Sequence, residues 1–349
     1  MWQFYIYQDW NTVYTPEHVN HWENLLKESP NSHVFFHPTL VKSWIKTYLP
    51  IRDMSPIFIN GIEKNSKNEV FLPLVLWNRG WKHFGVRSII PIGYSDYDYH
   101  DPIFKKTPTD INSFWNELMN KLTSIKADNI IIDGIRNSLA IKRAEWQTKD
   151  LCPYLDLSNI NNEEQLMMFF KTSLRGDIRR QIRRLNELGA LSLKEYKSVD
   201  EAQETFNVFM NEHSLRWPKA YKAPLFHQNM LSEGLASIVH FSSLNIGNKP
   251  IAWHLGFEYN GIYYYYMPVG DHNYSKYSPT KIHLFYLMVR AVDKGLKKFD
   301  HLRGDENYKS GFSNGVDNVN SLIIKNDSFN STIKIMADSY SHNFISKLR

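Results

Sequence analysis

The fold of this chain is decided by the segment Ile251-Ala-Trp-His-Leu-Gly-Phe-Glu-Tyr259, which continues through Asn260-Gly261 into Ile262-Tyr-Tyr-Tyr-Tyr-Met267. Both flanks are rich in aromatic and β-branched residues, which favour strands. Asn-Gly is a strong signal for a two-residue turn because both residues tolerate positive φ. The sequence therefore predicts a β-hairpin over residues 251–267.

The hairpin stands within an alternation of helices and strands. Ser198-Val-Asp-Glu201 is a capping box, in which the serine and glutamate side chains satisfy backbone N–H groups at the start of a helix. Gly295 is a stop signal for a later helix. The second half predicts, in order, helices at about 198–216 and 226–232, strands at 238–244, 251–259 and 262–267, a helix at 281–294, strands at 298–302 and 321–324, and a helix from about 331.

The first half repeats this order, with helices at about 16–28 and 40–48, strands at 56–60, 70–77 and 87–92, a helix at 111–125 and a strand at 129–133. Two short echoes support a duplication. Pro91-Ile-Gly93 and Pro268-Val-Gly270 follow the third strand, while Asp133-Gly-Ile-Arg136 and Asp300-His-Leu-Arg303 lie on the fourth. We therefore predict an α+β chain of two modules, residues 1–150 and 151–349. Each has a mixed, mostly antiparallel sheet flanked by helices, and a basic helix at 171–188 lies near the junction.

The composition predicts a globular, cytoplasmic protein. The chain has 349 residues, 42% apolar and 22% charged, which is enough to bury two cores. Its longest strongly apolar stretch, Val70 to Trp77, is too short to span a membrane, and its one cysteine, Cys152, can form no internal disulfide. The net charge of +5 suits anionic ligands. Because the sequence has no zinc-ligand spacing, P-loop or Gly-x-Ser-x-Gly motif, we expect no metal.

A resemblance to a known family rests on a succession of segments between residues 250 and 312. These are the hairpin, Tyr274-Ser-Lys-Tyr-Ser-Pro-Thr-Lys281 and Phe299-Asp-His-Leu-Arg-Gly-Asp-Glu-Asn-Tyr-Lys309, joined in the first half by Val34-Phe-Phe-His-Pro38, Trp44 and Gly93-Tyr-Ser-Asp-Tyr97. Together they resemble the acetyltransferase family that includes proteins linked to cellulose biosynthesis, with Fem-type peptidoglycan transferases as more distant relatives. The chain departs from these relatives at Thr280, where they generally carry glycine, and at Phe312, where they often carry tryptophan.

The resemblance implies a fold of two tandem GNAT-like modules and transfer of an acyl group to an amine. It also implies an acyl-CoA donor, with acetyl-CoA as the first expectation. We expect the donor to bind the C-terminal module and the acceptor to lie on the side of the N-terminal module.

The loop Tyr277-Ser-Pro-Thr280 opens a helix and is the candidate seat for the donor. The first N–H groups of a helix lack internal partners, and Pro279 suits this position because it has no N–H. Such a helix end attracts phosphate through these amides and the helix dipole. We predict that the donor pyrophosphate binds Tyr277, Ser278, Thr280 and Lys281; an ordinary capped helix is the alternative.

The basic helix places its apolar side chains on one stripe and Arg175, Arg179 and Arg183 on another. Arg175 and Arg179, at its start, are candidates for contact with the donor phosphates. The same face could also bind an anionic lipid, a sugar nucleotide or an RNA acceptor stem. A solvated helix face is the alternative for most of these arginines.

Three residues are candidates for catalysis. Asp96 or His254 would act as general base, and Tyr308 would donate a proton to the leaving group. Substrate-binding roles are predicted for Tyr97, Glu258, Tyr266, Arg303, Asp305 and Lys309. Glu258 shares a strand face with His254 and is a further candidate base. The alternatives are a turn cap for Asp96, a satisfied buried side chain for His254 and a salt-bridged surface loop for residues 303–309.

The sequence thus predicts an N-acyltransferase that works by direct attack in a ternary complex, because no convincing nucleophile is present. The expected acceptor is a small molecule or sugar nucleotide, such as an amino sugar of nucleotide-sugar or surface-polysaccharide biosynthesis. The first alternative is an aminoacyl-tRNA-dependent, Fem-like transferase, for which tRNA would be a partner. The second is a non-catalytic module that binds carbohydrate or nucleic acid.

Overall fold

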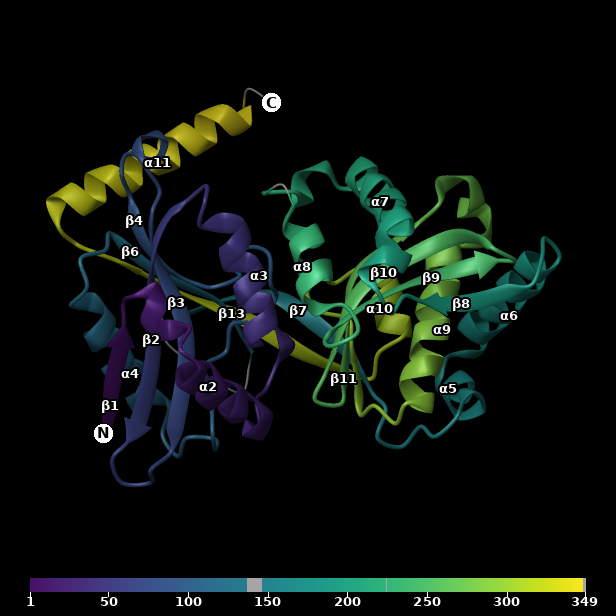
Figure 1. The fold of residues 1–349 in the computed structure, drawn as a ribbon, viewed down its shortest axis with the longest axis horizontal. Helices are drawn as coiled ribbons and strands as arrows, with labels where there is room; N and C mark the ends of the chain where they lie inside the picture. The colour runs from purple at the N-terminus through teal and green to yellow at the C-terminus, as the bar shows by residue number, and fades with distance from the viewer. Residues whose placement is uncertain (137–145, 224, 348–349) are drawn as a thin grey trace. The chain divides into compact units, whose positions relative to one another are not determined.

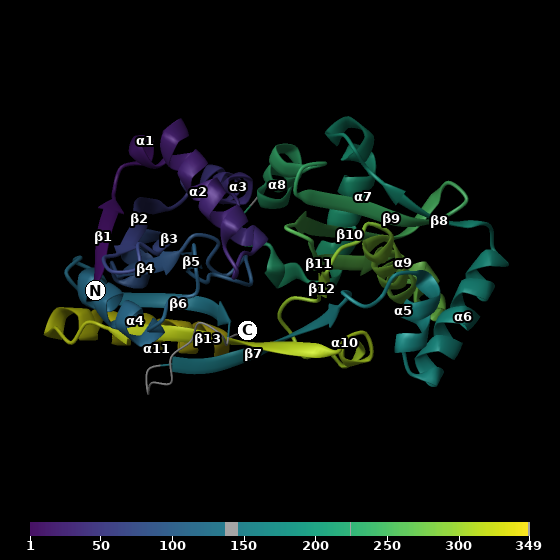
Figure 2. The same cartoon turned by 90° about the horizontal axis from the view of Figure 1, so that it is seen from below.

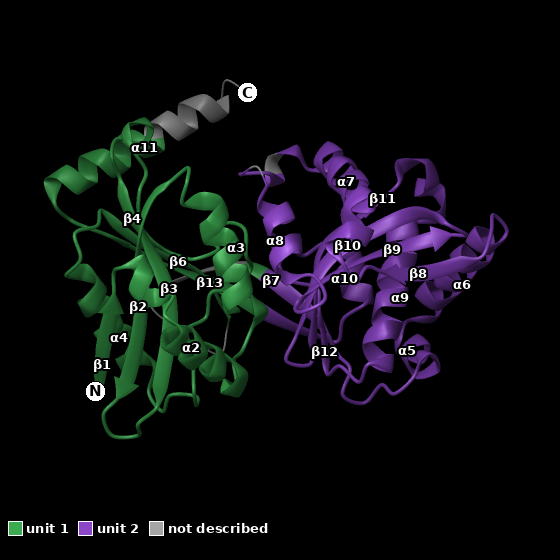
Figure 3. Ribbon diagram, viewed as in Figure 1, with its two compact units in different colours: residues 1–150, 318–349 green, residues 151–317 purple. Residues whose placement is uncertain are grey.

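The computed structural model describes residues 1–136, 146–223 and 225–347. The chain divides into two compact units (Figure 3). Unit 1 comprises residues 1–150 and 318–349, and unit 2 comprises residues 151–317. None of the described helices combines the length and the apolar character needed to cross a bilayer.

Unit 1 has the sheet order β1-β2-β3-β4-β6-β13, in which only β4 and β6 pair in parallel (Figure 1). Its elements are β1 (Trp2–Tyr7), α1 (Trp10–Val13), α2 (Pro16–Glu28), α3 (Pro38–Tyr48), β2 (Asp53–Glu63), β3 (Glu69–Asn78), β4 (Arg87–Pro91), β5 (Ile103–Phe104), α4 (Ile111–Thr123), β6 (Asn129–Arg136), β13 (Gly315–Lys325) and α11 (Phe329–Lys347). The short strand β5 pairs with β3.

Aromatic side chains form the core on both faces of this sheet. Trp22 of α2 stacks on Phe71 of β3 with ring centroids 4.9 Å apart, and Phe114 of α4 lies 6.0 Å from Phe4 of β1. The strand registers place Phe4 and Phe71 on opposite faces. Helices α2 and α4 therefore cover opposite faces, as Figure 2 shows.

Unit 2 has the sheet order β7-β12-β11-β10-β9-β8, in which only β11 and β12 pair in parallel. Its elements are β7 (Trp146–Asp156), α5 (Glu163–Phe169), α6 (Thr172–Asn186), β8 (Leu191–Glu195), α7 (Val199–Arg216), α8 (Phe226–Gly234), β9 (Val239–Ile246), β10 (Lys249–Tyr259), β11 (Ile262–Gly270), the 3-10 helix η5 (His272–Tyr277), α9 (Pro279–Asp293), β12 (Lys298–Asp300) and α10 (Asn307–Gly311).

Helices cover both faces of this sheet as well. Phe241 of β9 meets Phe206 of α7 with ring centroids 5.3 Å apart, whereas the next residue, Ser242, lies 3.1 Å from His283 of α9. Successive residues of a strand point to opposite faces. Helices α7 and α9 therefore lie on opposite sides of the unit 2 sheet.

The predicted hairpin is confirmed. Strands β10 and β11 pair antiparallel, and the turn is made by Asn260 at φ 48° and Gly261 at φ 75°. The predicted fold class, α+β with mostly antiparallel pairing and flanking helices, is likewise confirmed. At the start of α7, Ser198 accepts the N–H of Glu201 as a capping box requires, but the Glu201 carboxylate accepts from Lys197 instead of Ser198.

The C-terminal segment departs from the sequence prediction. Residues 318–349 were expected in the C-terminal module, but they belong to unit 1. The reason is that β13 pairs antiparallel with β6, from Val319 opposite Arg136 to Lys325 opposite Asn129. Pairing between strands so distant in sequence leaves no local signal.

Candidate functional site

The parallel pair at the centre of unit 2 opens along its length. Strand β11 pairs with β12 only over Ile262–Tyr264, although β11 continues to Gly270. Leu255 of β10 lies opposite Met267, and Phe257, two residues later, lies opposite Tyr264, so β11 carries one extra residue in this interval. A bulge of this kind leaves a residue outside the ladder and turns backbone groups outward. On the β12 side, β11 thus has no strand pairing with β12 beyond Tyr264 among the described residues.

Helix α9 begins close to the end of this open strand. A Cβ atom placed on Gly270 would come within 2.6 Å of the Thr280 hydroxyl, so glycine permits this approach. Ser278, at φ 53°, is the N-cap and makes no side-chain capping bond. Within the described residues, the hydroxyls of Ser278 and Thr280 and the Thr280 N–H have no protein partner.

The expected row of open amides is reduced to one. The Ser278 carbonyl accepts the N–H groups of Lys281 at 3.0 Å and Ile282 at 3.2 Å. Pro279 has no N–H to offer, so only the Thr280 amide is left open in this turn. The helix dipole adds attraction for an anion at the same point. The start of α9 therefore offers one amide and two hydroxyls to a ligand.

Helix α6 lies against the start of α9, so the structure brings together the two segments that were predicted to bind the donor. The Lys281 ammonium lies 2.8 Å from Asp177, and this hydrogen bond lowers the pKa of the Asp177 carboxyl. The Arg184 guanidinium stands 4.8 Å from the centre of the Tyr277 ring and donates to the Lys276 carbonyl at 3.2 Å. Lys281 and Tyr277 are therefore already engaged by α6.

The first two arginines of the basic stripe differ in their surroundings. Arg175 donates to the sulfur of Met168 and the hydroxyl of Thr172, both at 3.1 Å. Arg179 is exposed and lines a pocket between α5, α6 and α9. Neither contacts the start of α9 through a hydrogen bond or an ion pair.

His254 is completely buried between the sheet and α9. Its Nδ1 lies 3.1 Å from the Tyr263 hydroxyl, which lies 2.7 Å from His240, and His240 in turn lies 3.1 Å from Glu195. The His254 ring stacks flat on Tyr265, with ring centroids 4.3 Å apart. Burial holds the pKa of His254 well below its usual range, so the imidazole is neutral. His254 thus supports Tyr265, the residue at the bulge, from beneath.

Glu258 lies on the same strand as His254, near the C-terminal end of α9. It accepts from the Arg290 guanidinium at 2.9 Å and lies 3.4 Å from the Lys294 ammonium. Burial raises the pKa of the Glu258 carboxyl, but the charges and hydrogen bonds of Arg290 and Lys294 together outweigh it, so the pKa is lowered. Tyr266 is half-buried and packs its ring 5.1 Å from that of Phe257. Glu258 is therefore held by cations of α9 in a structural arrangement.

The segment around α10 contains both buried and accessible candidates. Lys309 is only 3% exposed, and its ammonium donates to the Arg303 carbonyl at 2.6 Å and to Glu306 at 2.8 Å, which pins the loop. Asp305 is exposed, and Arg303 is half-buried. Tyr308 is 40% exposed, and burial of its hydroxyl raises the pKa above the ordinary value of 10, so the phenol stays protonated well above neutral pH.

Tyr308, Tyr265 and Arg216 form a group that the sequence did not reveal. Burial has the largest effect on the pKa of both tyrosines and raises it, whereas the charge of Arg216 acts to lower both pKa values and Tyr308 raises the pKa of Tyr265. Arg216 also stands 4.6 Å from the centre of the Trp217 ring. Nothing in the run of four tyrosines distinguishes Tyr265, and Arg216 reads as an ordinary end-of-helix cation.

Asp96 and Tyr97 belong to unit 1. Asp96 accepts from the Trp44 indole N–H at 3.0 Å. Tyr97 is buried, donates its hydroxyl hydrogen to the Leu40 carbonyl at 3.0 Å, and stacks on Phe35 with centroids 5.2 Å apart. Both side chains thus help to pack α3 against the loop that follows β4. Among the described residues of either unit, no three His, Cys, Asp or Glu side chains gather as metal ligands would.

Comparison with known structures places this fold among several proteins. FemX has a TM-score of 0.58 at 10% identity, covering 86% of this chain and 95% of FemX. A conserved protein of unknown function from Bacteroides thetaiotaomicron has a TM-score of 0.56 at 11% identity, covering 92% of this chain and all of the other. The C-terminal domain of a putative lysylphosphatidylglycerol synthetase from Agrobacterium fabrum has a TM-score of 0.52 at 9% identity, covering 86% and 95%. At such identities the likeness concerns the fold alone.

Sequence comparison gives one further finding. No protein with a curated description matches the chain. Residues 172–310, from the start of α6 into α10, match the family described as "Acetyltransferase (GNAT) domain". This match covers less than half of the chain and lies entirely in unit 2. That part of unit 2, which holds the opened strand pair and the start of α9, is therefore similar to a GNAT acetyltransferase domain.

Proposed function

We propose that unit 2 transfers an acyl group from an acyl-CoA thioester to an amine. The observation that carries this proposal is the bulged edge of β11, which in the described chain is unpaired with β12 beyond Tyr264 and which η5 connects to the start of α9. An extended carrier can lie along such an edge while its phosphates meet a helix N-terminus. The family match of residues 172–310 supports the same reading.

The groups at the start of α9 fit the anionic part of a CoA-type donor. The Thr280 N–H and the hydroxyls of Thr280 and Ser278 have no protein partner in the described chain. They would bind a phosphate oxygen, and the helix dipole would favour its charge. The bound donor supplies a thioester carbonyl: the amine nitrogen forms a bond to its carbon, the C–S bond breaks, and the thiol leaves.

The residues near the bulge would serve the reacting end. Backbone N–H groups freed at a bulge are suited to stabilise the oxygen that gains charge during attack. Tyr308, protonated at neutral pH, would donate a proton to the departing sulfur. His254 is too deeply buried to reach an amine and would act as a positioning residue beneath Tyr265.

The acceptor in this proposal is an amino sugar that carries an acidic group. Trp217 and Tyr308 expose 38% and 40% of their surface, and Arg216 is exposed beside Trp217. Aromatic rings pack well against the apolar faces of sugars, and an arginine can bind a phosphate or carboxylate. Nucleotide sugars and amino sugars of surface polysaccharides share this chemistry.

The test is an assay of the full-length protein with acetyl-CoA and longer acyl-CoAs against amino sugars, both free and as nucleoside diphosphate derivatives. Thiol release should require both substrates, and mass spectrometry should find the acylated amine. Acyl-CoA should also raise the melting temperature by mass action. If no acyl-CoA shifts the melting temperature and none releases thiol with any amine, the proposal is wrong.

Aminoacyl-tRNA is a second candidate donor, favoured by the exposed arginines of α6. Arg179 and Arg183 have no acidic partner in the described chain. Binding of charged tRNA that weakens steeply with salt, together with no binding of acyl-CoA, would select this candidate.

A further inference from the structure

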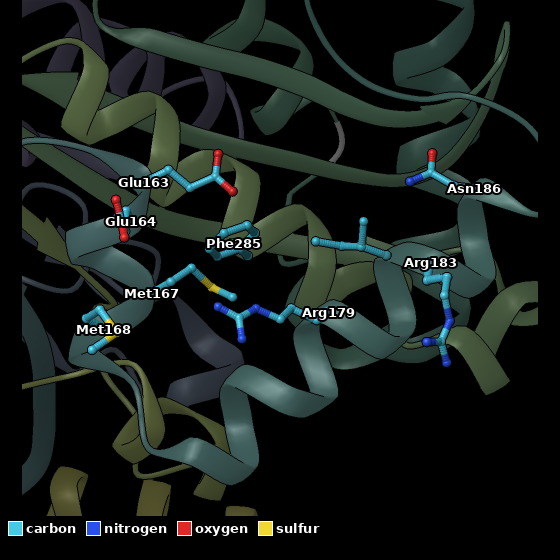
Figure 4. A pocket seen from close by; sticks show the side chains of 9 residues that line it. Glu163, Glu164, Met167, Met168, Arg179, Arg183, Asn186 and Phe285 are labelled. Atoms are coloured by element: carbon cyan, nitrogen blue, oxygen red, sulfur yellow. The ribbon is translucent and has the colours of Figure 1, made fainter.

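A pocket of about 750 Å³ lies in unit 2 between α5, α6 and α9, apart from the start of α9 (Figure 4). Its volume falls within the range of small-molecule sites in proteins. Helix α6 contributes Arg179, Ile182 and Arg183, α5 contributes Glu163 and Met167, and α9 contributes Phe285. The pocket is thus walled by charged side chains and floored by apolar ones.

Helix α6 divides its arginines between two sides. Arg180 is paired with Asp177, and Arg184 is held by Tyr277 and Lys276 on the side facing η5. Arg179 and Arg183, one turn apart, both line the pocket and have no acidic partner in the described chain. Figure 4 shows the Arg183 side chain extending away from Arg179, so Arg179 is the cation directed at an anion in the pocket.

Arg179 is directed into the pocket. Figure 4 shows its side chain extending toward Met167 and Phe285. Met167 and Phe285 line the pocket although only 7% and 2% of each is exposed, and Ile182 is half-buried beside them. Methionine sulfur and aromatic rings pack well against flat heterocycles. The cation and the apolar floor can thus contact one ligand together.

The opposite wall sets the orientation of that ligand. Glu163 and Glu164, in the first turn of α5, form no ion pair among the described residues. Their negative charges repel an anion from the α5 side, and their carboxylate oxygens accept hydrogen bonds from neutral donors. Asn186 on α6 adds a side-chain amide at the rim. An occupant must therefore place its anion toward α6 and an uncharged polar edge toward α5.

We propose that this pocket binds a nucleoside phosphate. Its phosphate would contact Arg179, with the charge of Arg183 one turn away, and its base would pack on Met167, Ile182 and Phe285 with its polar edge toward Glu163. Inorganic phosphate would leave the apolar floor uncovered. A free nucleotide and the nucleotide end of a larger molecule share this chemistry; only the second case, in which the molecule is a CoA donor, rests on the function proposed above.

The experiment is calorimetric titration of the full-length protein with ADP, CoA and inorganic phosphate, using Arg179→Ala and the control Arg180→Ala. ADP should bind more tightly than phosphate, because only ADP covers the floor. Loss of one charge-assisted contact should weaken ADP binding by about tenfold to a hundredfold in Arg179→Ala. Arg180→Ala should stay within about twofold of the wild type. Arg179 is exposed and unpaired in the described chain, so its removal should leave the melting temperature unchanged.

Comparing the ADP and CoA titrations shows whether the natural ligand is a free nucleotide or the nucleotide end of a CoA donor. Parallel loss of ADP and CoA affinity in Arg179→Ala identifies the nucleotide end of a CoA donor, whereas loss of ADP affinity alone identifies a site for a free nucleotide. A Thr280→Glu variant that loses CoA but keeps ADP would support this pocket independently of acyl transfer. The proposal is overturned if the wild type binds ADP no better than phosphate, or if Arg179→Ala binds ADP as the wild type does.

Discussion

The two units contain the same parallel strand pair but complete it differently. In unit 1, β4 and β6 pair only at Ser88–Asn129 and Ile89–Ile130. The chain then turns at Gly93, which has a positive φ and whose lack of a Cβ leaves room for the Tyr97 ring, and returns along the edge of β6 that β4 leaves unpaired. The His100 N–H donates to the Gly134 carbonyl at 2.9 Å, and Asp101 forms an ion pair with Arg136. Unit 1 thus fills its opening with its own buried loop.

In unit 2 the corresponding strand is β11, and the described chain after it continues into helices and does not return along the edge of β12. After Gly270 the chain enters η5 and α9, and among the described strands none pairs with β11 on the β12 side beyond Tyr264. The same strand order therefore yields one opening filled by a loop of unit 1 and one in which β11 has no described strand partner on the β12 side beyond Tyr264. The two units differ in the connection that follows β4 in unit 1 and β11 in unit 2. This one connection decides which unit is suited to hold a ligand.

The largest expected effect comes from removing the seal of unit 1. Asp101 is fully buried, and Arg136→Met would leave its charge without its ion-pair partner. Removing one partner of a buried pair costs about 3–5 kcal/mol of unfolding free energy. Urea unfolding followed by tryptophan fluorescence should detect this loss, because eight of the ten tryptophans, all but Trp217 and Trp253, belong to unit 1.

Arg136→Lys is the matched control, since it keeps the charge but loses the fork of donors, and it should recover part of the stability. Donor affinity per folded molecule should be unchanged in both variants. A parallel loss of donor affinity would mean that unit 2 does not hold the donor alone.

The next largest effect should come from placing a charge at the opening of unit 2. Thr280→Glu puts a carboxylate beside the only open amide of the first turn of α9. A like charge about 4 Å from the donor phosphate should weaken acyl-CoA binding by about a hundredfold to a thousandfold. An acid in the first turn favours the helix, so the melting temperature should not fall. Thermal shift and calorimetry with acetyl-CoA measure both quantities.

Two controls accompany this change. Thr280→Gln keeps the size without the charge and should lose less than about tenfold. Ser95→Asp places a charge in the exposed turn after β4 of unit 1 and should leave donor binding unchanged. Equal loss in Ser95→Asp and Thr280→Glu would break the distinction between the two openings.

Local chemistry explains which parts of this picture the sequence could predict. The turn at Asn260-Gly261 and the helix start after Pro279 depend on the conformational preferences of one or two residues, and both appear in the structure. The partner of β13 and the sealing of unit 1 depend on contacts between residues far apart in sequence, for which periodicity carries no signal.

The candidate site shows the same limit. The basic character of α6 was evident, but the ion pair between Lys281 and Asp177, which engages the predicted donor-binding lysine, joins residues 104 positions apart. The first turn of the helix was expected to leave its amides free, whereas the Ser278 carbonyl accepts two of them. A candidate residue could thus be named from sequence, but its availability depended on the fold.

Lowering the pH should test how much the buried histidines between α9 and the sheet of unit 2 contribute to stability. Burial lowers the pKa of His283 from its ordinary 6.5 to about 3, so the folded state disfavours the protonated ring. The neutral ring therefore contributes stability above about pH 6.5, and this contribution is lost as the pH falls toward 3. Between pH 7 and pH 5 the loss from this one residue is about 2 kcal/mol.

His283→Gln removes the titration and can keep a hydrogen bond to Ser242. Urea unfolding at pH 7 and pH 5 should show a smaller drop in this variant than in the wild type. His272→Gln, at an exposed position of η5, is the control and should follow the wild type. An equal drop in all three proteins would mean that His283 does not contribute to acid sensitivity.

The smallest effect on activity is expected from substituting His254. This substitution tests whether unit 2 catalyses acyl transfer by positioning the substrates or with His254 as a general base. His254→Gln leaves the bulge and the start of α9 intact, and we expect kcat/KM at pH 7 to stay within about tenfold of the wild type, with an unshifted pH profile. A general base contributes roughly a hundredfold to ten-thousandfold. Tyr263→Phe, which breaks the chain from His254 to His240, should behave similarly. A loss of a hundredfold or more in His254→Gln, at an unchanged melting temperature, would place proton transfer in the buried layer. The functional difference between the units would then come from the titratable side chains beneath α9, and not from the loop after β4 that fills the opening of unit 1.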